Sequence, residues 1–141
     1  TETATETTTT EQVAAGGEGD DSKGFFIQPT IIADVDEKAR LMQEEIFGPV
    51  LVVIPFKTEE EAIQIANDSI YGLAGVVWSN DLRRAHLVAD QINSGLFWIN
   101  CWYYRDLRTP FGGSKASGIG REGGRHSFEF YTEAKTITMK L

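Results

Sequence analysis

Hydrophobic and polar residues alternate in blocks along the central part of the chain, and the blocks predict strands and helices in turn. Continuous apolar runs at residues 50–56, 71–79 and 95–100 are typical of strands that are buried on both faces. The intervening segments, 58–68 and 80–92, carry apolar residues at helical spacing. This order of elements predicts right-handed crossovers and a parallel, doubly wound sheet, which places the chain in the α/β fold class.

Residues at the helix boundaries and at two strand ends refine this prediction. Thr58 is expected to cap the first helix, with Glu61 three residues later completing a capping box. The second helix is expected to begin near Asp81. The indole rings of Trp78 and Trp98 are expected to lie in the core.

The two ends of the chain have a different composition. Residues 1–12 are rich in Thr and Glu and are predicted to be a tail, because they cannot bury enough surface to fold. Residues 13–133 are then the folded part, with an extended segment at 25–32 and further helices near 36–45 and 121–133. Residues 134–141 include the alternating segment KTITMKL, which is typical of a strand that pairs with another copy of the chain.

Charge and composition narrow the classes of function. The net charge is −8, which combines −12 over residues 1–82 with +4 over residues 83–141. The acidic half argues against nucleic-acid binding, whereas the basic half can attract a small anionic ligand. No apolar run is long enough to predict a membrane span, and a single cysteine, Cys101, suits a reducing compartment such as the cytoplasm.

Residues 101–124 form the candidate ligand-binding loop, because they follow the last predicted strand and open sheets bind ligands at that edge. Gly118, Gly120 and Gly123 match G-x-G-x-x-G, but no strand leads directly into them, so tight turns before a helix compete with a dinucleotide turn. Cys101 is open to two interpretations, a nucleophile or a small buried hydrophobe, since neither histidine lies at a diagnostic spacing.

The segment QEEIFGPV, residues 43–50, is a second candidate. Two adjacent carboxylates and a phenylalanine precede a Gly-Pro turn and a strand, so that one carboxylate and the ring can face a pocket. A solvated helix end is the competing interpretation.

Five stretches together resemble the C-terminal part of the aldehyde dehydrogenase superfamily: EEIFGPVLVVIPF, ANDSIYGLAGVVWS, INCW, PFGGSKASGIGRE and YTEAKTITMK. The resemblance implies that Glu45 binds the ribose hydroxyls of NAD and that Phe47 packs beside the nicotinamide. It also implies that residues 101–109, including Cys101 and Trp102, form the loop that anchors the aldehyde substrate, and that Phe111 lines the substrate tunnel. It implies a homo-oligomer assembled through the C-terminal strand and no metal site.

The nucleophilic cysteine and general base of this family belong to a region upstream of the resemblance. We therefore expect the chain to be a fragment of an NAD-dependent aldehyde dehydrogenase, without catalytic residues of its own and inactive alone. A non-catalytic interaction module that keeps the fold is the alternative, and an independent nucleotide-binding domain is a third.

Arg105 is the candidate for substrate selectivity. Its guanidinium can bind a carboxylate at the far end of the aldehyde, unless Arg105 or Arg108 simply pairs with Asp106. The sequence RDLRTPFGG is similar to that of the muconic semialdehyde dehydrogenases of the 2-hydroxy and 2-amino types, which favours Arg105 as the carboxylate-binding residue. Arg108 is then expected to support the loop.

Overall fold

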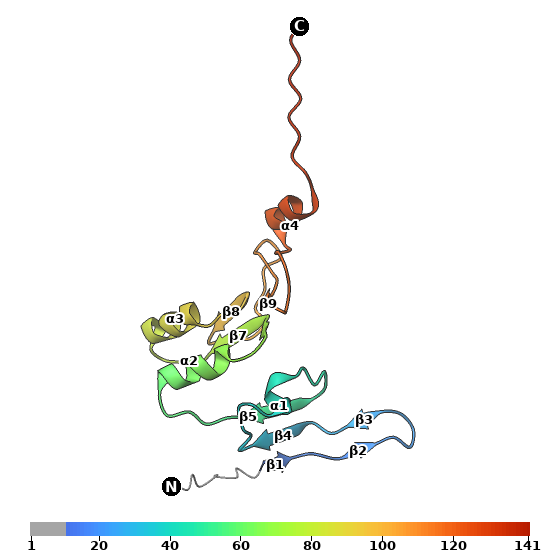
Figure 1. Ribbon diagram of the computed structural model, residues 1–141, viewed down its shortest axis with the longest axis vertical. Coiled ribbons are helices and arrows are strands. Elements are labelled where there is room, and N and C mark those ends of the chain that lie inside the picture. Colours follow the sequence, from blue (N-terminus) through green and yellow to red (C-terminus); the bar gives the residue numbers. More distant parts are fainter. Residues whose placement is uncertain (1–10) are drawn as a thin grey trace, which may run out of the picture. The chain divides into compact units, whose positions relative to one another are not determined.

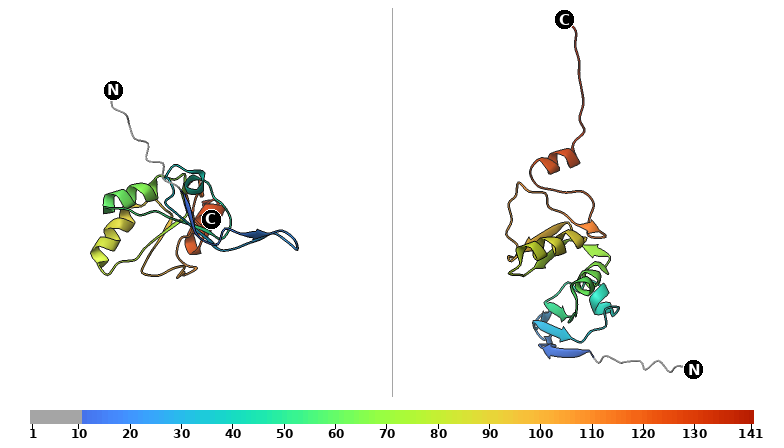
Figure 2. Two further views of the ribbon diagram at one scale, coloured as in Figure 1. Left: turned by 90° about the horizontal axis from the view of Figure 1, so that it is seen from below. Right: turned by 90° about the vertical axis from the view of Figure 1, so that its left-hand side faces the viewer.

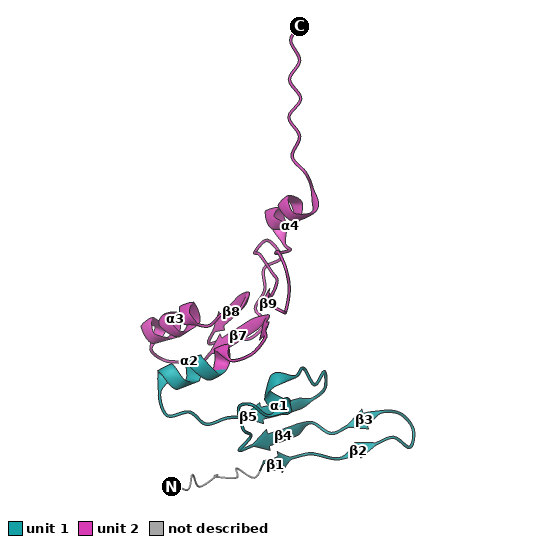
Figure 3. Ribbon diagram, in the orientation of Figure 1, with its two compact units in different colours: residues 1–65 teal, residues 66–141 magenta. Residues whose placement is uncertain are grey.

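The computed structural model describes residues 11–141 and divides into two compact units, Thr1–Ile65 and Ala66–Leu141, which are treated separately below (Figure 3). Most of the predicted tail, residues 1–12, lies outside the described residues. The division falls within one helix, α2 (Glu59–Asn67), so that the helix begins in the first unit and ends in the second.

The first unit is built on a three-stranded mixed sheet (Figure 1). The elements of this unit before α2 are β1 (Gln12–Ala15), β2 (Gly19–Asp20), β3 (Phe26–Ile27), β4 (Thr30–Ala33), α1 (Arg40–Gln43) and β5 (Val50–Val53). The central strand, β4, runs antiparallel to β1 and parallel to β5, with Thr30 opposite Val50 and Ala33 opposite Val53. A separate two-stranded ribbon pairs β2 with β3.

The second unit contains a parallel strand–helix–strand motif. The elements after α2 are β6 (Tyr71–Gly72), β7 (Ala74–Val77), α3 (Leu82–Gln91), β8 (Leu96–Ile99), β9 (Ser114–Lys115) and α4 (Gly124–Tyr131). Strands β7 and β8 pair from Ala74 opposite Leu96 to Val77 opposite Ile99, and α3 packs against both of them (Figures 1 and 2). A short antiparallel pair joins β6 to β9.

Both predicted helix starts are confirmed by their hydrogen bonds. The amide of Glu61 donates to the Thr58 hydroxyl at 3.2 Å, and the Glu61 carboxylate accepts from the Lys57 amide at 2.7 Å. The Asp81 carboxylate accepts from the Arg84 amide at 3.0 Å and so caps α3. At each start a side-chain oxygen satisfies an amide that the first helical turn leaves without a partner.

The core of each unit is small. In the second unit, Ala85 of α3 and Trp98 of β8 are buried, and in the first unit Thr30 and Val35 are buried. Trp98 therefore lies in the core as predicted, whereas the prediction for Trp78 is wrong because its side chain is 67% exposed.

The expectation of strands buried on both faces is also wrong for β5. Leu51 is 58% exposed and Val53 is 45% exposed, while Val50 and Val52 are half-buried. Side chains alternate across a strand, so the described chain covers only one face of β5. A continuous apolar run reports what both faces of a strand can tolerate, and it does not show that both are covered.

The topology agrees with the prediction in part. The parallel β7–α3–β8 unit is confirmed, but β5 pairs with β4 rather than with β7, because apolar runs indicate strands without naming their partners. The sequence pattern did not indicate the short strands β1 and β2, and the helix expected near 36–45 is limited to the four residues of α1. In the single chain residues 132–141 form no helix or strand, since none of the described strands pairs with them.

Candidate functional site

The first candidate segment, in the first unit, starts where α1 ends. The Arg40 guanidinium donates to both carboxylate oxygens of Glu44, four residues later, at 2.8 and 2.7 Å. This side-chain hydrogen bonding lowers the pKa of Glu44 and raises the pKa of Arg40. Glu44 is therefore already satisfied by its own helix, which leaves the adjacent Glu45 as the acidic residue that can accept a ligand.

Glu45 and Phe47 are both presented to solvent. Among residues 11–141, no hydrogen bond or ion pair engages the Glu45 carboxylate. Phe47 is 92% exposed and has a left-handed backbone conformation, φ 57°, which costs about 1 to 3 kcal/mol for a non-glycine residue. The turn that follows is fixed by a hydrogen bond from the Thr30 amide to the Pro49 carbonyl at 2.8 Å. The segment thus holds an unpaired carboxylate near an exposed aromatic ring.

The second candidate segment, in the second unit, is the loop that follows β8. Its base is the buried Trp98, whose indole N–H donates to the carbonyl of Tyr104 at 2.9 Å. The Trp98 ring lies 5.2 Å from the Trp102 ring and 6.2 Å from the Tyr103 ring, measured between centroids. These tilted ring contacts and the hydrogen bond tie the first residues of the loop to the sheet.

Asn100 fixes the point at which the loop leaves the sheet. Its side-chain amide donates to the Ser79 carbonyl and its side-chain oxygen accepts from the Ser79 amide, both at 2.8 Å. Asn100 itself has φ 54°, a left-handed conformation that asparagine tolerates better than most residues. The ends of the parallel strands β7 and β8 are thereby joined, and the loop starts from a defined position.

The two loop arginines have different partners. Arg108 binds Asp106 through its guanidinium, with Nε 2.9 Å from one carboxylate oxygen, and this hydrogen bonding lowers the pKa of Asp106. Arg105 does not contact Asp106. Its guanidinium lies over the Phe111 ring, 3.8 Å from the centroid, and its Nη2 is 3.3 Å from the Glu122 carboxylate.

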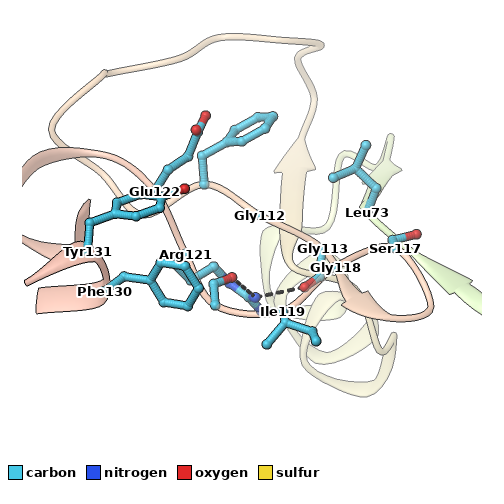
Figure 4. Close-up of a pocket in the computed structure, with 12 residues that line it drawn as sticks. Leu73, Gly112, Gly113, Ser117, Gly118, Ile119, Arg121, Glu122, Phe130 and Tyr131 are labelled. Atoms are coloured by element: carbon cyan, nitrogen blue, oxygen red, sulfur yellow. Dashed lines mark hydrogen bonds between the residues drawn. The ribbon is translucent and has the colours of Figure 1, made fainter.

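The far side of the loop is closed by backbone hydrogen bonds between Phe111 and Glu122, at 2.7 and 2.8 Å. The Arg121 guanidinium donates to the carbonyls of Gly113 and Gly120, each at 2.8 Å, and so holds the glycine-rich stretch together (Figure 4). These groups border a cavity of about 320 Å³, which is also lined by Leu73, Ser117, Ile119, Phe130 and Tyr131 (Figure 4).

The glycines of this stretch behave as turn residues. Gly120 has φ 74° and Gly123 has φ 100°, conformations that side chains disfavour, and Gly123 directly precedes α4. A side chain at Gly120 would also collide with the Phe130 ring. The interpretation as tight turns before a helix is therefore confirmed for these two positions.

The structure brings two of the predicted substrate residues together, since Arg105 stacks on Phe111. Trp102, 64% exposed, belongs to the aromatic cluster on Trp98, and the thiol of Cys101 is half-buried. Sequence reasoning missed Glu122, because nothing in the sequence indicates that residues 105 and 122 meet. Within residues 11–141 no cluster of side chains suited to a metal ion occurs. No described helix is long and apolar enough to cross a membrane.

The parallel β7–α3–β8 unit, with an arginine and aromatic rings in the loop after β8, defines an α/β protein with a binding loop at a strand end. The aldehyde dehydrogenase family model matches residues 2–137. The chain therefore belongs to the aldehyde dehydrogenase family.

Two relatives and one solved structure illustrate this membership. The chain is 56% identical to the 2-aminomuconic semialdehyde dehydrogenase of Bos taurus, over 83% of this chain and 24% of the relative. It is 56% identical to the 2-hydroxymuconic semialdehyde dehydrogenase of Pseudomonas putida, over 84% of this chain and 24% of the relative. A crystal structure of a Mycobacterium tuberculosis aldehyde dehydrogenase complexed with NAD+ superimposes with a TM-score of 0.82 at 52% identity, over 87% of this chain and 26% of the other. The chain thus spans about a quarter of the length of the proteins it matches.

Proposed function

We propose that this chain is the part of an NAD-dependent aldehyde dehydrogenase that receives a semialdehyde with a carboxylate at its far end. The enzyme oxidises the aldehyde to the acid, and the single cysteine of this chain suits a reducing compartment such as the cytoplasm. The observation that carries the proposal is the separation of the two loop arginines, because Asp106 is taken by Arg108 and Arg105 stays available.

Arg105 is suited to a carboxylate ligand in three ways. Its side chain is only 25% exposed, so its charge is less screened than that of a surface arginine. The Phe111 ring holds the guanidinium plane in place, which lowers the entropy cost of binding. The contact with Glu122 at 3.3 Å uses one nitrogen only, so other donors of the planar fork can bind a second carboxylate.

The anchor loop supplies the remainder of the substrate site in this proposal. Trp102 and Phe111 offer aromatic surface to the chain of the aldehyde, and Cys101 contributes a small half-buried side chain at the start of the loop. The relatives named above act on muconic semialdehydes, which favours the same class of substrate here.

The cofactor proposal concerns Glu45 and Phe47. Glu45 offers an unpaired carboxylate, which can accept hydrogen bonds from the two hydroxyls of a ribose, and the exposed Phe47 ring can pack beside a nicotinamide. The residues present therefore fit the nicotinamide end of NAD. When bound, NAD accepts the hydride that leaves the aldehyde carbon.

Residues 134–141 are proposed to form the strand through which the complete enzyme assembles with a second copy. Ile137 is 80% exposed and Met139 is 77% exposed, and they lie two residues apart, as on one face of a strand. An unpaired segment of this kind is a template for strand addition. We likewise propose that the doubly wound parallel sheet belongs to the complete catalytic domain.

The substrate proposal is tested in a chimera in which this chain replaces the matching quarter of the Pseudomonas putida enzyme. The substrates are 6-oxohexanoate and hexanal, which share a chain length and differ in the terminal carboxylate. Arg105→Ala should lower kcat/KM for 6-oxohexanoate by about ten- to a hundredfold, the cost of one charged hydrogen-bonded contact, and leave hexanal nearly unchanged.

The matched control is Arg108→Ala, which removes an arginine from the same loop. Because Arg108 is paired with Asp106, its loss should affect both aldehydes to a similar extent. If Arg105→Ala also reduced activity on both aldehydes equally, Arg105 would only hold the loop together and the proposed substrate class would be wrong.

A non-catalytic interaction module is the second candidate function, and the exposed apolar side chains of the second unit favour it. Ile119 is 93% exposed and Tyr131 is 73% exposed, and exposed apolar groups of this size are typical of surfaces that bind another protein. The two functions are distinguished by aldehyde oxidation in the chimera, which the module does not require.

A further inference from the structure

Arg105, Phe111 and Glu122 form a small cluster that we call the Arg105 clamp. Phe111 and Glu122 are locked to each other by two backbone hydrogen bonds, at 2.7 and 2.8 Å. Arg105 contacts both of them, through the Phe111 ring at 3.8 Å and the Glu122 carboxylate at 3.3 Å. The guanidinium is therefore held between a ring and a carboxylate whose relative positions are fixed by the backbone.

The other charged groups nearby are committed elsewhere. Asp106 is bound by Arg108, and the Arg121 guanidinium donates to the carbonyls of Gly113 and Gly120. Among the described residues, Glu122 is the only carboxylate that contacts Arg105. The local charge balance at the clamp is therefore set by these two side chains.

The pair is built so that the carboxylate can be replaced. Glu122 is 56% exposed and makes a single contact at 3.3 Å, longer than the 2.7 to 2.9 Å typical of a strong charged hydrogen bond. An ion pair of this exposure contributes little to stability. A second carboxylate that meets the guanidinium with both oxygens has the better geometry.

We propose, on the basis of the substrate function above, that Glu122 is a positioning residue that sets the preference for an anionic substrate. Its carboxylate orients Arg105 over Phe111 in the absence of substrate. It also competes with the substrate carboxylate for the same guanidinium, so the enzyme binds a carboxylated aldehyde less tightly than Arg105 alone would allow.

The experiment uses the same chimera and the same pair of aldehydes. Glu122→Gln keeps an acceptor oxygen for Arg105 and removes the competing charge. We expect the KM for 6-oxohexanoate to fall by about two- to fivefold, the range for exposed ion pairs, with no change in the KM for hexanal or in either kcat. Glu129→Gln is the matched control, because Glu129 pairs with Arg125 in α4 and contacts neither Arg105 nor Phe111.

Two further variants separate competition from a structural role. Glu122→Asp keeps the charge and should retain the wild-type ratio of the two KM values. In an Arg105→Ala background, Glu122→Gln should leave that ratio unchanged, since the charge it removes then has no partner. A Glu122→Asp variant that shifts the ratio as Glu122→Gln does would overturn the proposal.

The outcomes distinguish this proposal from the substrate function. If Arg105→Ala is selective for the carboxylated aldehyde but Glu122→Gln leaves the KM ratio unchanged, competition by Glu122 is wrong and the substrate function stands. If Glu122→Gln lowers kcat for both aldehydes without separating their KM values, Glu122 is structural only. If Arg105→Ala is itself not selective, both proposals fail.

Discussion

Trp98→Phe should loosen the start of the anchor loop. Trp98 is 8% exposed, and its indole N–H donates to the Tyr104 carbonyl at 2.9 Å. Phenylalanine keeps an aromatic ring in β8 but has no N–H. The substitution therefore leaves the Tyr104 carbonyl without this donor and weakens the ring contacts to Trp102 and Tyr103.

The expected size of the effect follows from these contacts. A lost hydrogen bond costs about 1 kcal/mol, and leaving a part-buried acceptor unsatisfied with a smaller ring beneath the loop adds about 1 kcal/mol. The free energy of local opening should fall by about 2 kcal/mol in total, which corresponds to about thirtyfold more frequent opening.

Hydrogen exchange in the chimera measures this opening directly. We expect faster deuterium uptake in a peptide covering residues 100–111, in which the Asn100 and Thr109 amides donate hydrogen bonds at 2.9 and 3.0 Å. Trp102→Phe is the matched control, because Trp102 is 64% exposed and its indole donates no hydrogen bond within the described chain. Equal uptake in Trp98→Phe and the wild type, or an equally large effect of Trp102→Phe, would refute the role given to the Trp98–Tyr104 bond.

Three further predictions concern a cap, a titration and an end segment. Asp81→Ala should destabilise α3 by about 1 kcal/mol, because the Arg84 amide loses its acceptor, and faster exchange of that amide would show it. The hydrogen bonds from Arg108 lower the pKa of Asp106 below its ordinary value of 3.8, so the pair is fully formed above that pH and is lost as the pH falls through the lowered pKa. The carboxyl carbon shift of Asp106, followed by NMR, should therefore titrate at a lower pH than in Arg108→Ala. Deletion of residues 135–141 should reduce self-association of the chain in light scattering, whereas an unchanged mass would argue against an oligomerisation strand.

Local features of the fold could be predicted because short-range chemistry decides them. The caps at Thr58 and Asp81 need only a side-chain oxygen two or three residues before an amide. The parallel pairing of β7 with β8 follows from the single helix between them and the preference for right-handed crossovers. The loop after β8 is then placed at a ligand-binding edge without further information.

Pairings between distant segments could not be predicted in the same way. The approach of β4 to β5 and the contact of Arg105 with Glu122 depend on how the chain folds back, and no residue pattern marks either of them. The exposure of Trp78 could not be predicted for a related reason. An apolar side chain indicates that a position can be buried, but what covers it depends on other parts of the folded chain.

Both candidate segments use the same physical device to select a ligand-binding residue. Each contains two like charges, Glu44 and Glu45 in one and Arg105 and Arg108 in the other. In each, one member is neutralised by a partner at most four residues away, since Arg40 binds Glu44 and Asp106 binds Arg108. Satisfying one charge locally leaves its neighbour with unused hydrogen-bonding capacity, and that neighbour is the residue assigned to the ligand. Because a partner within four residues can be recognised in the amino-acid sequence, a pair of like charges of which only one has such a partner indicates which of the two is free to bind a ligand.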